Sequence, residues 1–238
     1  MACATMSSIL FGLSFIFVKQ SVNEVSTFTL LSWRFLFALL GMGICALLGI
    51  IKLDLRGKDL KPLLLIALFH PILYYIVETW GIALTTATES GIVIACIPIV
   101  TLILSAIMLK ERPTKLQVAS ILISVAGIFF MVLIQGLSAS LNPLGYFFLL
   151  ITILSAGLYV IYSRKAAAYT STEKTFVMAA SGAVVFTICA VIEHASAGTL
   201  HELIVLPFVN HDFLISLIYL SVACSVIATN LRNYSISI

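Results

Sequence analysis

The sequence predicts an all-α membrane protein, a polytopic bundle of about eight transmembrane helices. Of its 238 residues, 61% are apolar and only 10% are charged, whereas a soluble domain carries roughly 25% charged residues. The apolar residues fall in uncharged blocks of about 17 to 25 residues, the length at which an α-helix crosses a hydrocarbon core about 30 Å thick. These blocks are apolar on all sides and do not alternate in polarity, which excludes a membrane β-barrel.

Eight helices can be placed along the chain from these blocks and from the charged or turn-forming residues between them. In order, they are expected at residues 2–18, 27–51, 63–84, 90–109, 116–137, 144–162, 175–192 and 213–231. Two of the starts carry a specific signal, because Asn142 precedes Pro143 and Lys61 precedes Pro62. Asparagine is a favourable N-cap, and proline fits the first helical turn, where the N–H that it lacks would have no partner.

The N-terminus and the cysteines give no sign of secretion or of a metal centre. Met1 leads directly into the first apolar block without a basic start, so this block is expected to be a retained helix and not a cleaved signal peptide. All five cysteines lie inside apolar blocks, where they are expected to be small buried side chains without a disulfide framework. No cofactor is expected.

The basic residues predict the orientation in the membrane. Most of the 13 Lys and Arg residues occur in one set of alternate loops, at residues 52–61, 110–115 and 164–174, with Arg232 ending the last helix on the same side. Lys19 lies on the other side. Because cytoplasmic loops carry the excess of Lys and Arg, these loops and the N-terminus are expected to be cytoplasmic in a multi-pass protein of the cell membrane.

The helices divide into two halves, residues 1–137 with five helices and residues 142–238 with three. An odd number in the first half makes the second half enter the membrane in the opposite sense, which is the sign of an inverted repeat. An equal second half would need two more helices. The chain is therefore expected to lack the last two helices of a ten-helix repeat, and an alternative is a fragment or assembly subunit without independent transport.

Three stretches carry a resemblance to a known family. The most specific is residues 80–132, WGIALTTATESGIVIACIPIVTLILSAIMLKERPTKLQVASILISVAGIFFMV, and the others are residues 11–34 and 154–165. They resemble the EamA family of the drug/metabolite transporter superfamily, although Phe11 replaces a usual tryptophan and Arg232 a commoner aromatic residue. The resemblance implies a five-plus-five inverted repeat around a central cavity, working as an exporter of small solutes such as metabolites, amino acids or drugs.

The third helix has a polar face at membrane depth. His70, Tyr74 and Glu78 are each four residues apart, so they share one side of a helix. Ionisable groups in hydrocarbon are costly and normally face a cavity or a partner. We expect this face to border a central cavity together with the first, fourth and sixth helices, the alternative being a purely structural contact between helices.

Arg34 and Glu78 are expected to interact. Arg34 lies about 10 Å below the outer end of the second helix and Glu78 about 9 Å below that of the third, so an ion pair within about 4 Å is plausible. Glu89 is a competing acid, and Arg34 could instead extend towards the outer surface. Glu78 is also the leading candidate for proton coupling, a role that competes in part with the ion pair.

Pro71 and Pro98 lie inside the third and fourth helices, where each should leave the carbonyl four residues earlier, at Ala67 or Ile94, without its partner. Broken helices often border the binding site of a transporter, but such prolines can also be simple bends. The candidate solute-binding residues are Ser14, His70, Tyr74, Glu78, Trp80, Pro98, Ser155 and Tyr159.

Other chemistry finds little support. His194, His201 and His211 lie in the outer loop before the last helix with Glu193, Glu202 and Asp212, but their spacing matches no compact metal motif, and a solvated loop is expected. An intramembrane enzyme would need a nucleophile with a base, and Ser90 and Ser181 lack that context. The expected partners are a small solute and the lipid bilayer, with self-association as a further option, and no nucleic acid is expected.

Overall fold

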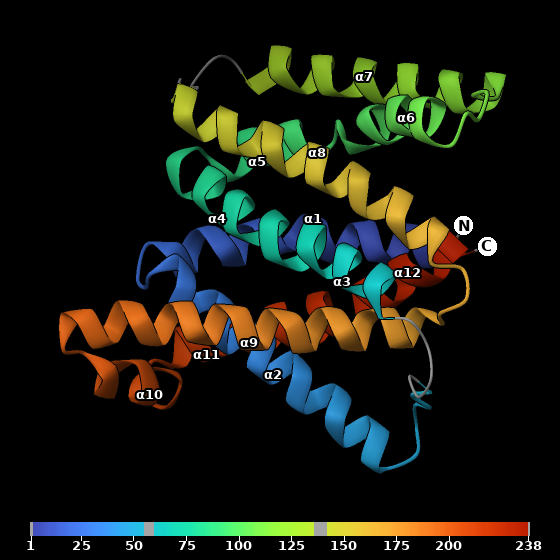
Figure 1. Ribbon diagram of the computed structural model, residues 1–238. Helices are drawn as coiled ribbons and strands as arrows, with labels where there is room; N and C mark the ends of the chain where they lie inside the picture. Colours follow the sequence, from blue (N-terminus) through green and yellow to red (C-terminus); the bar gives the residue numbers. More distant parts are fainter. Residues whose placement is uncertain (1, 55–59, 136–141, 238) are drawn as a thin grey trace.

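The computed structural model describes residues 2–54, 60–135 and 142–237 of the chain. Within these ranges every regular element is a helix and none is a strand, which confirms the predicted fold class (Figure 1). Among the described residues, seven helical segments are long and apolar enough to cross a membrane. They run side by side, and both termini lie at the same end of the bundle.

Four of the spans are continuous or nearly so, and three are built from several segments. The bounds, in chain order, are α1 (Ala2–Val22), α2 (Thr27–Leu47), α3 (Lys61–Ala67), η1 (Leu68–Leu73), α4 (Tyr74–Leu84), α5 (Ala87–Ile94), α6 (Ile97–Met108), α7 (Lys115–Gln135), α8 (Pro143–Lys165), α9 (Ser171–Ala197), α10 (Leu200–Val209), α11 (His211–Ile218), η2 (Tyr219–Ala228) and α12 (Thr229–Ser237). The third span comprises α3, η1 and α4, the fourth α5 and α6, and the last α11, η2 and α12.

Polar residues at the helix starts satisfy backbone N–H groups that have no partner inside the helix. The predicted cap at Asn142 is confirmed, because its Oδ1 accepts hydrogen bonds from the N–H groups of Leu144 and Gly145. Thr86 and Thr170 begin α5 and α9 with reciprocal capping boxes, which the sequence analysis did not anticipate. Pro62 lies in the first turn of α3, also as predicted.

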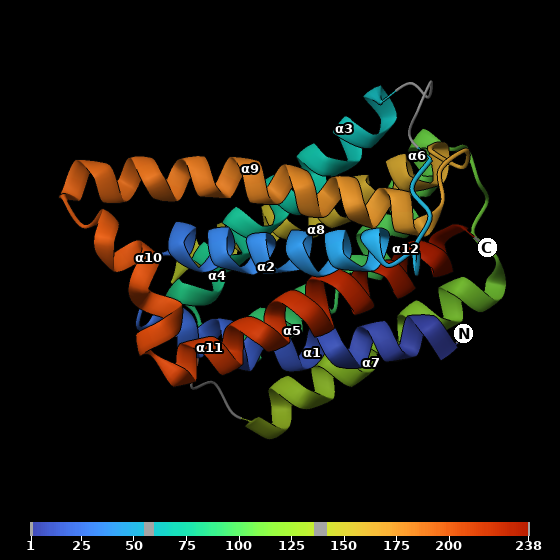
Figure 2. The same ribbon diagram turned by 90° about the horizontal axis from the view of Figure 1, so that it is seen from below.

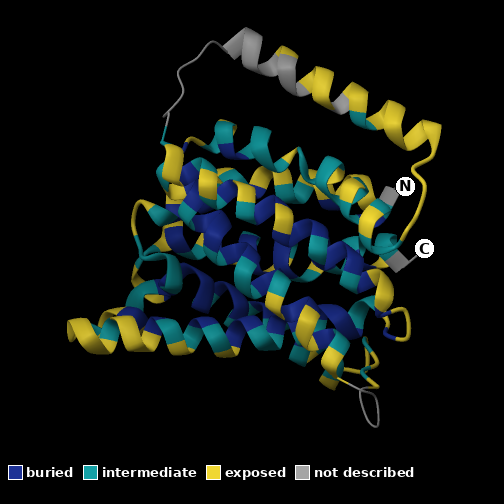
Figure 3. Cartoon of the chain, turned by 45° about the horizontal axis from the view of Figure 1, so that its top comes forward, coloured by how far each residue is buried: buried dark blue, intermediate teal, exposed yellow. Residues whose placement is uncertain are grey.

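The core forms where α2 packs against α9 and where α4 packs against α8. A Cβ atom at Gly182 of α9 would lie 2.5 Å from Cδ1 of Phe35, so the absence of a side chain there allows the Phe35 ring to pack directly on the α9 backbone. The Phe35 ring also contacts the rings of Tyr75 and Phe186, with centroids 5.2 Å away in both cases. Figure 3 shows the buried residues concentrated between these helices.

Helix α7 corresponds to the helix expected at residues 116–137, of which residues 136 and 137 lie outside the described ranges. It lies apart from the other helices, and the side chains described along it are almost all exposed (Figure 3). Its described apolar part, Lys115–Gly127, is shorter than the seven spans. The exposed side chains include Leu116, Leu122 and Ile123, which suit a lipid environment.

The segment between residues 193 and 212 is largely helical and not the expected loop, although most of its charged and histidine side chains are exposed. Helix α9 continues to Ala197, five residues past the predicted end, and stops where Gly198 takes a positive φ of 72°. The chain then forms α10, which folds back beside α11 at the end of the bundle opposite the termini (Figure 2). Apolar contacts explain this helix, because Leu203 and Pro207 are buried and the indole N–H of Trp33 donates to the carbonyl of Leu203.

Close packing at Gly182 can be tested by substitution. We expect Gly182→Val to lower the free energy of unfolding by about 1–3 kcal/mol, because the new side chain overlaps a buried ring. Gly43→Val in α2 is the matched control, since a Cβ atom there meets nothing within 4 Å. The measurement is the melting temperature of the purified proteins in detergent, and equal melting temperatures for the two variants would contradict the packing.

Candidate functional site

The third span is broken beside Pro71. His70 leaves helical geometry, with φ −147° and ψ 110°, and the segment Leu68–Leu73 is π-helical. The break was predicted, with the carbonyl of Ala67 expected to lose its partner. The carbonyl that a side chain binds is instead that of Phe69. It accepts a hydrogen bond from Ser155 Oγ at 2.6 Å and another from the N–H of Tyr74. The pairing changes because the chain kinks at His70, so the segment joins two helical turns across the break and is not one regular helix.

The fourth span is broken as well. Helix α5 ends at Ile94 and α6 begins at Ile97, with Pro98 in the first turn of α6. The two residues between them, Ala95 and Cys96, form a turn. The predicted interruption is therefore present, and it separates two half-helices instead of bending one continuous helix.

A cavity of about 480 Å³ lies beside these breaks. It is enclosed by helices from both parts of the sequence, namely α1, α4, α5, α6, α8 and α12. The residues that line it include Ser7, Phe11, Ser14, Phe15, Tyr74, Glu78, Gly91, Ile94, Ile97, Pro98, Val160, Arg232 and Ile236. Most are apolar or aromatic, with a few polar groups, as is usual for small-molecule sites.

Glu78 and Tyr74 form the polar part of the α4 wall. The hydroxyl of Tyr74 donates to the Glu78 carboxylate at 2.7 Å, and only 5% of Glu78 is exposed. One turn of helix separates the two residues, which the sequence spacing predicted. The carboxylate thus lies at the cavity with one fixed hydrogen bond, a geometry that can hold or release a proton.

The predicted direct ion pair between Arg34 and Glu78 was wrong. The guanidinium of Arg34, which is 1% exposed, donates from Nε to Ser225 Oγ at 2.9 Å and lies 4.3 Å from the centroid of the Tyr75 ring. Among the described residues no carboxylate lies within ion-pair distance of it. Similar depth along two helices was a poor guide, because Arg34 points towards η2 of the last span.

His70 is buried among three tyrosine rings and does not line the cavity. Its ring centroid lies 4.7, 5.0 and 4.7 Å from those of Tyr74, Tyr75 and Tyr159. Within the described part of the chain, neither imidazole nitrogen has a hydrogen-bond partner. The predicted shared face therefore divides at the break, with Tyr74 and Glu78 at the cavity and His70 behind it.

Three further candidates lie away from the cavity surface. Ser155 binds the carbonyl of Phe69, and Tyr159 is buried with its hydroxyl donating to Asn233 Oδ1 at 2.6 Å. The Trp80 ring packs on Phe28 and Phe148, with centroid distances of 6.2 and 5.4 Å. Of the eight candidates, Ser14, Tyr74, Glu78 and Pro98 line the cavity.

Arg232 is a charged cavity residue that was not among the candidates from the sequence. It was assigned to the cytoplasmic end of the last helix, but α12 continues to Ser237 and places Arg232 on the cavity wall. Its guanidinium carbon lies 5.8 Å from the ring centroid of Phe11 and 5.1 Å from that of Tyr159. The missed signal was that residues 232–237 contain neither glycine nor proline, so nothing in them stops the helix.

Polar contacts join neighbouring helices at the two ends of the bundle. Lys19 Nζ donates to the carbonyls of Ile82, Ala83 and Thr85 at 2.9, 3.0 and 2.7 Å, which ties α1 to the last turn of α4. A cation is favourable there because the C-terminal carbonyls of a helix carry negative partial charge.

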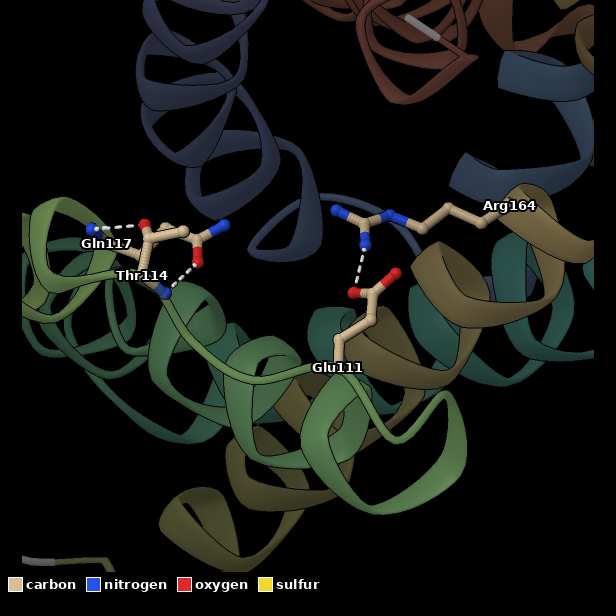
Figure 4. Close-up of polar contacts among 4 residues, drawn as sticks. All are labelled: Glu111, Thr114, Gln117 and Arg164. Carbon is tan, nitrogen blue, oxygen red and sulfur yellow. Dashed lines mark hydrogen bonds and ion pairs between the residues drawn. The ribbon is translucent and has the colours of Figure 1, made fainter.

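At the opposite end, Glu111 and Arg164 join the turn after α6 to the end of α8. Their side chains form an ion pair with an N–O distance of 2.9 Å, and Thr114 and Gln117 form a reciprocal cap at the start of α7 (Figure 4). Both charged side chains are substantially exposed, so the pair contributes at most about 1 kcal/mol.

Comparison with known proteins identifies the family. Residues 1–133 match the model of the EamA-like transporter family. The chain is 36% identical over 238 residues to the uncharacterized transporter YcxC of Bacillus subtilis (strain 168), a match that covers 98% of this chain and 75% of the relative. An uncharacterized transporter of Archaeoglobus fulgidus is 29% identical over 153 residues, covering 64% of this chain and 53% of the relative.

A solved crystal structure of another protein shares the fold, with a TM-score of 0.70 at 21% sequence identity. The alignment covers 99% of this chain and 79% of the chain in that structure. The match to the Bacillus subtilis transporter covers 98% of the chain. The predicted resemblance to the family is therefore confirmed. This chain belongs to the EamA-like transporter family of multi-pass membrane transporters.

Proposed function

We propose that the chain exports small organic solutes, and that they pass through the cavity between α1, α4, α5, α6, α8 and α12. The observation that carries this proposal is the position of the cavity beside two interrupted spans. Interrupted helices border the substrate sites of many secondary transporters, because irregular backbone is tolerated at membrane depth only where protein or a water-filled cavity surrounds it.

Alternating access suits the way the cavity is built. Helices α1, α4, α5 and α6 come from the half that we assign to residues 1–137, and α8 and α12 from the half assigned to residues 142–238. Rocking of one half against the other would open the cavity to each side in turn. The contact between α4 and α8 is close, since a Cβ atom at Gly81 would lie 2.7 Å from Leu149, and it offers a pivot for such motion.

Glu78 is our candidate for coupling transport to protons. Its carboxylate is held by Tyr74 at the cavity surface and, among the described residues, pairs with no cation. A carboxylate in this position can bind a proton on one side of the membrane and release it on the other as access changes.

The distribution of basic residues supports a cytoplasmic location for the end that carries both termini. The end of α2, the start of α3, the α6–α7 turn and the α8–α9 connection gather at that end (Figure 1), and the Lys and Arg residues of the loops belong to these connections. The positive-inside rule then places α10 and α11 outside.

The solute path is tested by filling the cavity. Gly91 lines the cavity, and a Cβ atom there meets nothing within 4 Å, so Gly91→Phe should fold normally and obstruct the path. In inside-out vesicles we expect uptake of at least one solute from a panel of labelled amino acids, carboxylates and a cationic dye. Gly91→Phe should reduce that uptake at least tenfold, to roughly the level of vesicles without the protein.

Gly43→Phe in α2 is the matched control, because Gly43 has equally open surroundings and does not line the cavity. It should keep native uptake. Native uptake in Gly91→Phe would rule out this cavity as the path. No uptake of any solute by the native protein would favour the alternative of an assembly subunit without independent transport.

Proton coupling is tested with Glu78→Gln, which keeps the size of the side chain and removes the titrating group. We expect the native protein to transport faster when a pH gradient is imposed, and the variant to lose this dependence while remaining folded. Glu202→Gln, on the exposed part of α10, is the control and should behave as the native protein. An unchanged response to the gradient in Glu78→Gln would exclude the coupling role.

Orientation is tested with single cysteines in a protein whose five native cysteines have been replaced. Ala168, in the α8–α9 connection, and Ala195, in the last turn of α9, are both exposed and have the same small side chain. Figure 1 shows the two ends of α9 at opposite ends of the bundle. A membrane-impermeant maleimide added to intact cells should label Ala195→Cys and should label Ala168→Cys only after the cells are opened. The reverse pattern would invert the orientation.

A further inference from the structure

Arg232 brings a cation to the cavity without a protein acceptor for it. An arginine side chain offers five N–H donors in a planar fork. Among the described residues, none accepts a hydrogen bond from the Arg232 guanidinium and no carboxylate forms an ion pair with it. Its protein contacts are the faces of the Phe11 and Tyr159 rings, which attract the cation but leave the N–H groups in its plane available.

The position of Arg232 is fixed by the residues behind it. Tyr159 is fully buried, and its hydroxyl donates to Asn233 Oδ1 at 2.6 Å. Asn233 in turn donates from Nδ2 to Thr175 Oγ1 at 2.9 Å. The ring beneath the guanidinium is therefore anchored to α9 and α12 by hydrogen bonds, and a group held in this way is preorganised for a ligand.

The charges near the cavity leave an excess of positive charge. Glu78 also lines the cavity, but its carboxylate is bound by the hydroxyl of Tyr74 and is not in ion-pair contact with Arg232. Arg34 adds a second buried cation, bound to Ser225. Two guanidinium groups and one carboxylate thus favour an anion here, and the low dielectric of the bundle strengthens the attraction.

The rest of the cavity wall suits an apolar body. Phe11, Phe15, Ile94, Ile97, Val160 and Ile236 supply aromatic and aliphatic surface. Two of the serine hydroxyls on the wall are already engaged as donors, Ser7 to the carbonyl of Ala228 and Ser14 to that of Phe11. A volume of about 480 Å³ accommodates a small organic molecule.

We infer that Arg232 binds the carboxylate of the solute, and that the cavity selects organic anions that carry this group on an apolar body. The inference rests on the proposed function, since it names the class of solute that the same cavity takes. The two N–H groups on one edge of a guanidinium match the two oxygens of a carboxylate, whereas a neutral amide or an ammonium group gains no such pairing.

The test measures binding of three probes of similar size to the purified protein in detergent, by isothermal titration calorimetry. The probes are 3-phenylpropionate, 3-phenylpropanamide and 3-phenylpropylamine, which differ in charge at one end of the same body. We expect the acid to bind at least about tenfold more tightly than the amide, as for hydrogen bonds between charged groups, and the amine to bind most weakly.

Arg232→Gln should lower the affinity for the acid to that for the amide, while the affinity for the amide stays unchanged and shows that the cavity has kept its shape. Arg232→Lys should keep part of the preference, because it retains the charge and loses the paired N–H groups. Arg164→Gln removes the same charge outside the cavity, at the ion pair with Glu111, and should leave all three affinities unchanged.

Equal affinities of the native protein for the acid and the amide would overturn the inference. So would a parallel loss of both in Arg232→Gln, or no binding of the acid at millimolar concentrations. The proposed function fails in a different way: if binding depends on Arg232 but Gly91→Phe transports as the native protein does, the anion site stands and the solute path lies elsewhere.

Discussion

A backbone carbonyl released inside a membrane must find a donor within the protein, because hydrocarbon supplies none. This constraint explains how the bundle can contain interrupted spans beside a cavity. At the first break, the hydroxyl of Ser155 on α8 binds the carbonyl of Phe69. At the end of the same span, Lys19 on α1 binds three carbonyls of the last turn of α4. Each donor comes from a neighbouring helix, so satisfying the backbone also joins the walls of the cavity.

These contacts have a consequence for motion. The break in the third span is bound by a side chain of one neighbouring helix, and the end of the span by a side chain of another. Ser155 belongs to α8 in the second half of the chain, whereas Lys19 belongs to α1 in the first. If the halves rock as we propose, the Lys19 contacts stay within the first half, whereas the Ser155 contact crosses from one half to the other.

The sequence predicted the elements well and the contacts between them less well. Apolar block length is set by membrane thickness, so the spans were found with boundary errors of a few residues, and the breaks followed from Pro71 and Pro98. Spacing of four residues correctly placed Tyr74 and Glu78 together. The Arg34–Glu78 contact failed because depth says nothing about the rotation of two helices about their axes, and Trp80 failed for the same reason, since it faces Phe28 and Phe148.

Arg34 and Arg232 show why residue type alone does not distinguish a structural charge from a functional one. Both are arginines inside the bundle that contact aromatic rings without an acidic partner among the described residues. Arg34 is fully buried, and its Nε binds Ser225, so its place is set by the packing of α2 on the last span. Arg232 lines the cavity, and its guanidinium lies over the rings of Phe11 and Tyr159 without a hydrogen-bond acceptor among the described residues. Burying a charge against a polar side chain stabilises one conformation, whereas leaving a charge at a cavity wall is costly unless a ligand compensates it.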